Sequence, residues 1–184
     1  MFLSRTARFL LVASAGLWLG AAIMLGFGVA PVNFGVAEQW ELTGSNPVMP
    51  EQNVNYRTIG GELTGLSIIR MNQLESVFLM LMVIGLAIMW SKDYGKRNAR
   101  ITLSVLVLCS AILFTVYALW IGAEMTEIRT TVPLDFSIED DALKSEHQLR
   151  FDALHPWYTR LMGLNMIVLA SILAVTEFRL TESR

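Results

Sequence analysis

Four long apolar blocks constrain what this chain can fold into. They cover residues 9–32, 66–90, 101–123 and 157–178. A bilayer core needs about 20 consecutive, mostly apolar helical residues, and each block reaches that length. The chain is 54% hydrophobic and 16% charged, whereas ordinary soluble domains are about 25% charged. We therefore predict an all-α integral membrane protein, a four-helix bundle that forms a single domain.

The charges outside the blocks divide into two sets. Lys and Arg concentrate near the N-terminus, at 91–100 and near the C-terminus, whereas 33–65 and 124–156 hold most of the acids. Short segments rich in Lys and Arg stay in the cytoplasm. We therefore expect both termini in the cytoplasm (N-in, C-in), with 33–65 and 124–156 as the outer loops.

The first block requires a distinction between a signal peptide and a helix that is retained. Arg5 and Arg8 would serve as the charged start, and the Ala-Ser-Ala sequence at 13–15 imitates a cleavage site. The apolar core would then be only 9–12, which is too short. Because the apolar run continues to Val32, we expect a retained transmembrane helix.

Small residues in the first block predict close helix packing. Gly16 and Gly20 form a G-x-x-x-G pair, which permits backbones to approach one another. We expect a tight crossing within the bundle, with a homodimer seam as the alternative. Trp18, in the middle of the helix, is expected to pack inside the bundle.

The two outer loops have mixed compositions. Residues 35–42 can either extend the first helix or lie on the membrane surface, whereas 43–55 are turn-rich and should be irregular. From Ala142 the pattern becomes helical, and Pro156 precedes the fourth block. Since a proline pushes the residue before it out of α geometry, we predict a short outer helix that leads through a kink into helix four.

Glu75 is the most costly residue of the four blocks. An ionised carboxylate facing lipid costs several kcal/mol, so we expect Glu75 to face the bundle, either paired or protonated. At about 1.5 Å per helical residue, Asn165 lies at nearly the same depth, and Asn72 lies one turn from Glu75. We predict Asn165 as the partner, with Tyr117 as a third member. A polar clamp that fixes helix packing and a functional site both remain open.

Helix four carries an outward stripe that contains both histidines. At about 100° per residue, the stripe comprises His147, Phe151, Leu154, His155, Tyr158, Met162 and Asn165. We expect a polar cluster that opens outward and consists of Glu75, Asn72, Asn165, Tyr158, Arg150 and Tyr117.

His155 carries the sharpest chemical hypothesis. With Glu124 and Asp152 it could ligate a metal ion, and alone it could shuttle protons or hold a carboxylate. A hydrogen bond to a neighbouring helix end is the alternative. A haem held by both histidines is excluded because His147 and His155 project from one helix face. A His/Met haem remains open, since the chain has 10 methionines, although the sequence requires no cofactor.

The sequence lacks the residues that hydrolases, phosphate-binding proteins and nucleic-acid-binding proteins require. No Ser or Cys has a visible general base, and neither an H-E-x-x-H motif nor a phosphate-binding glycine loop occurs. Cys109 is the single cysteine, and a net charge of −2 without a basic stripe argues against nucleic acid.

We therefore predict a non-enzymatic membrane module, an accessory or structural subunit that contacts the lipid bilayer and other membrane subunits or further copies of itself. Two alternatives stay open. One is a metal- or haem-handling protein that uses His155, and the other is small-solute or proton transport through Glu75.

Three segments resemble the four-helix domain of unknown function of the transmembrane protein 205 type. They are LWLGAAIMLGFGVAPVNF in the first block, Gly61–Gly65 at the start of the second helix, and RFDALHPWY leading to Asn165. The turn-rich part of the first outer loop looks like an insertion. The positions that match in the last segment are Arg150, Phe151, Leu154, His155, Tyr158 and Asn165.

This resemblance implies a bacterial inner-membrane protein or a eukaryotic secretory-pathway protein linked to tolerance of platinum drugs. We expect the bacterial inner (cytoplasmic) membrane. A weaker similarity to the copper resistance protein D type implies that copper is a candidate ligand.

Overall fold

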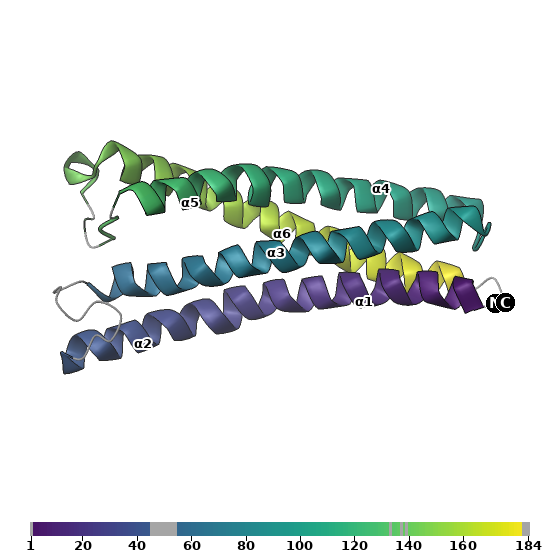
Figure 1. Cartoon of the computed structure of the whole chain (residues 1–184), viewed down its shortest axis with the longest axis horizontal. Helices are drawn as coiled ribbons and strands as arrows, with labels where there is room; N and C mark the ends of the chain where they lie inside the picture. The colour runs from purple at the N-terminus through teal and green to yellow at the C-terminus, as the bar shows by residue number, and fades with distance from the viewer. Residues whose placement is uncertain (1, 45–54, 133, 137, 139, 182–184) are drawn as a thin grey trace.

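The computed structural model describes residues 2–44, 55–132, 134–136, 138 and 140–181, and no strand occurs among them. Four long helical rods lie side by side (Figure 1). The all-α four-helix bundle expected from the apolar blocks is confirmed. In chain order the elements are α1 (Phe2–Met24), η1 (Leu25–Val29), α2 (Ala30–Thr43), α3 (Tyr56–Ser91), α4 (Arg97–Phe114), η2 (Thr115–Ile121), α5 (Gly122–Thr131), η3 (Asp141–Leu143) and α6 (Glu146–Thr181).

The outside of the bundle is apolar. Large side chains such as Phe27 and Ile167 are 81% and 65% exposed. Each rod is long and apolar enough to cross a membrane. An apolar surface of this extent is stable against lipid rather than water, as in a multi-pass membrane protein.

The helices form a ring in which α1 and α4 each pack against α3 and α6. Both termini lie at one end of the bundle, at the right of Figure 1, together with the turn between α3 and α4. An ion pair between Arg8 and Glu177 joins α1 to α6 there, and a pair between Arg100 and Asp93 joins α4 to the turn. We call the opposite end the distal end.

Two wide turns interrupt the rods. In η1 the Ala30 N–H donates to the carbonyl of Leu25, five residues back. Pro31 follows directly; it has no N–H to donate to the carbonyl of Phe27, four residues back, so the regular α-helical bonding is already interrupted at this point. In η2 the Gly122 N–H donates to the carbonyl of Tyr117 in the same way. Such π-helical turns frequently mark functional sites, and here η2 carries Tyr117, which is fully buried.

The helix ends differ from some of the sequence predictions. The extension of the first helix over 35–42 is confirmed, because α2 continues to Thr43; of the segment expected to be irregular, 45–54 lies outside the described residues. The predicted outer helix that continues through Pro156 into helix four is confirmed, because α6 runs through Pro156 as one 36-residue helix; it begins at Glu146 rather than at Ala142. A proline removes a single backbone donor, and a helix of that length tolerates the loss.

The tight crossing predicted at Gly16 and Gly20 is wrong. A Cβ at Gly20 would meet no atom within 4 Å, and one at Gly16 would meet only Leu173 at 4.0 Å. The close crossing of α1 with α3 is instead at Gly85, where a Cβ would lie 3.0 Å from the carbonyl oxygen of Ala7. Trp18 does pack inside the bundle, as expected, and is fully buried.

Candidate functional site

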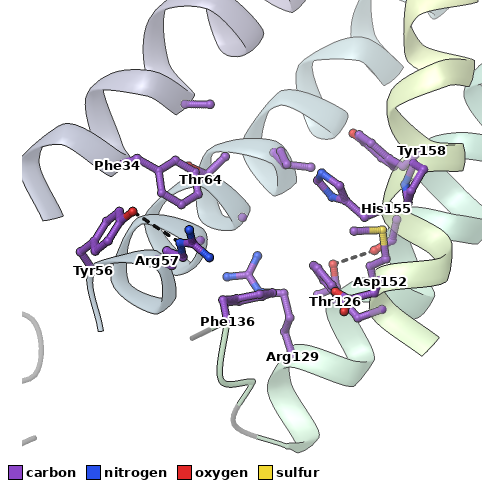
Figure 2. A pocket seen from close by; sticks show the side chains of 18 residues that line it. Phe34, Tyr56, Arg57, Thr64, Thr126, Arg129, Phe136, Asp152, His155 and Tyr158 are labelled. Atoms are coloured by element: carbon purple, nitrogen blue, oxygen red, sulfur yellow. Dashed lines mark hydrogen bonds between the residues drawn. The ribbon is translucent and has the colours of Figure 1, made fainter. Parts of the chain in front are cut away.

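A cavity of about 770 Å³ lies at the distal end of the bundle. Its walls come from α2 and α3 on one side and from α5 and α6 on the other, with Phe136 contributed by the loop after α5 (Figure 2). Most of the lining is aromatic, aliphatic or backbone, and Arg57, Arg129, Asp152 and His155 are its charged or titratable members. The helix ends thus enclose an apolar chamber with a few polar groups.

Glycines on α3 admit aromatic rings to the cavity wall. A Cβ at Gly60 would lie 2.5 Å from the ring of Phe34, on α2. A Cβ at Gly61 would lie 3.1 Å from the ring of Phe136. Any larger residue would therefore displace these rings, and the absence of a side chain at both positions is what lets the neighbouring segments contact α3 closely.

Arg129 crosses from α5 to α3 through a third glycine. A Cβ at Gly65 would overlap its guanidinium. Arg129 Nη2 donates to Glu62 Oε2 at 2.7 Å and to the Glu62 carbonyl at 3.1 Å, and the arginine side chain is only 13% exposed. Gly61, Glu62 and Gly65 therefore accommodate one aromatic ring and one arginine. This role was not apparent from the sequence, because Arg129 lies 67 residues from Glu62.

His155 lies in the cavity wall, as Figure 2 shows. Its ring stacks on Phe151, with centroids 6.0 Å apart and an interplanar angle of 19°. His147, on the same helix, is exposed and lies beside a separate shallow groove with Glu146 and Arg150. The two histidines of the predicted stripe thus face different surroundings.

The predicted metal ligands do not form a metal-binding group. Glu124 accepts a hydrogen bond from Arg150 at 2.6 Å, and Asp152 accepts one from Lys144 at 2.8 Å. Lys144 also pairs with Asp141 at 2.8 Å, and these two carboxylates hold the pKa of Lys144 above its usual value. Across the described part of the chain, no three His, Cys, Asp or Glu side chains are grouped so that they could hold a metal ion.

A hydrogen bond forms the floor of the cavity. Tyr158 lines the cavity, and its hydroxyl donates to Asn72 Oδ1 at 2.9 Å. Gly122, at the start of α5, packs closely against this pair, since a Cβ there would lie 3.3 Å from both the Asn72 amide and the Tyr158 ring. The prediction that Asn72 and Tyr158 share a cluster is confirmed, and this pair joins α3 to α6.

Below the floor lies a buried polar cluster. Tyr117 donates from its hydroxyl to Glu75 Oε2 at 2.9 Å, and the Asn165 amide donates to the Tyr117 oxygen at 3.4 Å. Ser110 donates to Asn165 Oδ1 at 2.7 Å. All four side chains are at most 2% exposed. The inward orientation predicted for Glu75 is confirmed.

Two predictions about the cluster are wrong. Asn165 is not the direct partner of Glu75, because the longer side chain of Tyr117, turned inward by η2, lies between them. Arg150 is not a member, since its side chain is 58% exposed and paired with Glu124. Ser110 was missed because an isolated serine in an apolar helix carries no signal.

The floor and the cluster are in contact through aromatic rings. Tyr158 and Tyr117 pack edge to face, with centroids 5.4 Å apart and an interplanar angle of 89°. The series continues from Tyr117 through Phe114 to Trp18 on α1. The cavity and the buried carboxyl are thus separated by one layer of side chains.

No family model, curated protein or solved structure matches this chain. The function is therefore argued from the geometry of the cavity and of the cluster beneath it.

Proposed function

We propose that this protein is a non-enzymatic membrane module that binds an amphipathic small molecule in the distal cavity. The observation that carries the proposal is the cavity of about 770 Å³ with largely apolar walls. Small-molecule sites typically span about 300–1,000 Å³ and combine apolar walls with a few polar groups. The distal cavity has both properties.

The lining indicates the class of ligand. Phe34, Phe136 and Phe151 offer three aromatic surfaces to an apolar body. The side chains of Arg57 and Arg129 lie in the same cavity (Figure 2) and offer hydrogen-bond donors to a polar end. A single-chain amphipath with a carboxylate or another acceptor headgroup matches this arrangement.

The membrane orientation belongs to the same proposal. The end that carries the termini holds the Lys- and Arg-rich segments, and such segments remain in the cytoplasm. The cavity then opens toward the outer face of a bacterial inner membrane. A ligand would reach it from the outer leaflet or from the outside solution.

The proposal includes an accessory role in a larger membrane assembly and the resemblance to the transmembrane protein 205 type. Support for the first is the absence of a complete catalytic set in the sequence. Support for the second is that Gly61–Gly65, a segment on which the resemblance is based, builds the cavity wall around Phe136 and Arg129. Co-purification in a mild detergent tests the accessory role; a protein that purifies alone and binds its ligand alone contradicts it.

Two threonines of α5 provide a matched test of the binding site. Thr126 lines the cavity, whereas Thr130, one turn later, is exposed, and each hydroxyl donates to the backbone carbonyl four residues back. In detergent micelles, titration with a fluorescent long-chain carboxylate should show saturable binding by the native protein. Thr126→Phe should abolish it because the new ring occupies the cavity, and Thr130→Phe should leave it unchanged.

Equal binding by both variants would place the probe on the lipid-facing surface and contradict the proposal. A long-chain amine of the same length serves as the second probe. The arginines predict that it binds more weakly than the carboxylate.

A further inference from the structure

Glu75 is a buried carboxyl with only half of its hydrogen-bonding capacity used. The side chain is fully buried in the middle of α3. Oε2 accepts from Tyr117, whereas Oε1 has no hydrogen-bond partner among the described residues. A buried polar atom without a partner is costly, and protonation of the carboxyl lowers that cost because the neutral acid loses less hydration on burial than the anion does.

The surroundings of Glu75 contain no countercharge. The groups that face it are two neutral donors, the indole N–H of Trp18 on α1 and the hydroxyl of Tyr117 on η2, and, from α6, Tyr158 and Asn165. No Lys, Arg or His among the described residues forms an ion pair with it. An ionised carboxylate in such a site would be both desolvated and unpaired, a costly state that protonation removes.

The cavity floor lies between this carboxyl and the distal end. Tyr158 belongs to both regions, since it lines the cavity and packs against Tyr117 at 5.4 Å. The side of the cluster toward the termini is closed by fully buried apolar residues, among them Met82 on α3 and Leu169 on α6. The distal route therefore crosses a single hydrogen-bonded pair, Tyr158 and Asn72, whereas the other route crosses the apolar core.

We propose that Glu75 is a proton-binding site that exchanges with the distal cavity through the Tyr158–Asn72 floor. In the loading step a hydronium ion that enters by the cavity transfers its proton to Oε1, an O–H bond forms, and water is left. Release reverses the step, with water as the proton acceptor. This inference depends on the cavity and not on the ligand proposed for it.

Infrared spectroscopy of the detergent-solubilised protein tests the protonation state. A neutral carboxylic acid absorbs at a C=O frequency well separated from that of a carboxylate. At neutral pH we expect this band in the native protein and its loss in Glu75→Gln. Glu124→Gln, at a partly exposed carboxylate that is paired with Arg150, is the control and should retain it. Identical spectra of the native protein and Glu75→Gln would overturn the proposal.

Transfer into heavy water then tests the route. The acid band shifts as its proton exchanges for deuterium, and the rate of that shift reports access to Glu75. Tyr158→Ala and Asn72→Ala each open the floor and should speed the shift on the order of tenfold or more, because truncating a buried contact eases local opening. Leu169→Ala removes a buried side chain on the other side of the cluster and should have a smaller effect.

The outcomes separate clearly. Faster exchange in either floor variant than in Leu169→Ala supports the distal route, and one folded floor variant is sufficient. Faster exchange in Leu169→Ala alone would overturn the route. No ligand is added in the exchange experiment. If the carboxylate probe fails to bind, the proposed function is contradicted, but the conclusion about proton exchange at Glu75 is unaffected.

Discussion

The two halves of the bundle are built from the same long helices, but the space between the helices is filled in one half and open in the other. Toward the termini, fully buried residues such as Leu11, Met82, Leu103 and Leu169 fill the space between helices. At the distal end, a cavity of about 770 Å³ remains between them. The difference arises because α2 and α3 pack continuously at the distal end, whereas α5 reaches α3 through an isolated side chain, Arg129, that inserts at Gly65. A helix pair joined by a few inserted side chains can enclose a chamber, whereas a continuously packed pair cannot.

The largest expected change in the free energy of unfolding comes from truncating a large apolar side chain in the packed half, compared with one in the cavity wall. Leu169→Ala in the packed half should lower the free energy of unfolding by about 2–5 kcal/mol, the range for a large buried side chain. Ile68→Ala in the cavity wall should cost less because Ile68 is only partly buried and already borders open space. Denaturant unfolding in bicelles measures both. Equal losses would mean that the cavity is filled or collapsed in the membrane.

Gly65→Ala tests the inserted arginine. Because the new Cβ overlaps the guanidinium, Arg129 must leave Glu62, and the unfolding free energy should fall by about 1–3 kcal/mol as charge-assisted hydrogen bonds are lost. Gly20→Ala is the control, since a Cβ there meets nothing within 4 Å. A thermal shift assay compares the two, and matching transition temperatures would show that Arg129 does not hold α5 to α3.

The buried cluster between the halves should tolerate a neutral replacement. Glu75→Gln keeps an acceptor for the Tyr117 hydroxyl and should change the unfolding free energy by less than about 1 kcal/mol, whereas Glu75→Ala leaves that hydroxyl unsatisfied and should cost about 1–3 kcal/mol. Chemical unfolding at neutral pH measures both variants. If Gln were as damaging as Ala, the carboxyl would be needed in its ionised form.

The last comparison concerns two arginine–glutamate pairs. Arg129→Gln should weaken binding of the long-chain carboxylate roughly tenfold, equivalent to about 1.4 kcal/mol of binding energy, because a donor in the cavity loses its charge. Arg150→Gln breaks a pair that is 58% exposed on the arginine side and outside the cavity, so it should bind the probe normally. Fluorescence titration compares them, and equal affinities would remove Arg129 from the binding site.

Much of the architecture follows from local patterns. Each apolar block is long enough to span a bilayer by itself, so the all-α bundle and its four rods could be read without any tertiary contact. The inward orientation of Glu75 follows from the same physics, because a carboxyl in lipid has no other stable place.

The partners of these residues could not be read in that way. Whether Glu75 meets Asn165 or Tyr117 depends on η2, which places the Tyr117 hydroxyl between α3 and α6. Likewise, Gly16 and Gly20 match the pattern for a close helix crossing but do not form one. Close contacts are made instead at Gly60, Gly61 and Gly65, where side chains from other elements approach α3.

The sequence alone determined that this chain forms membrane-spanning helices and that its one mid-membrane carboxyl must be shielded, since both depend on transfer free energies that act residue by residue. Only the tertiary structure decided that the distal ends enclose a chamber, that Arg129 crosses from α5 to reach Glu62, and that Glu124 and Asp152 pair with basic side chains instead of forming a metal-binding group with His155. Those outcomes depend on distances between segments far apart along the chain, which no local pattern encodes.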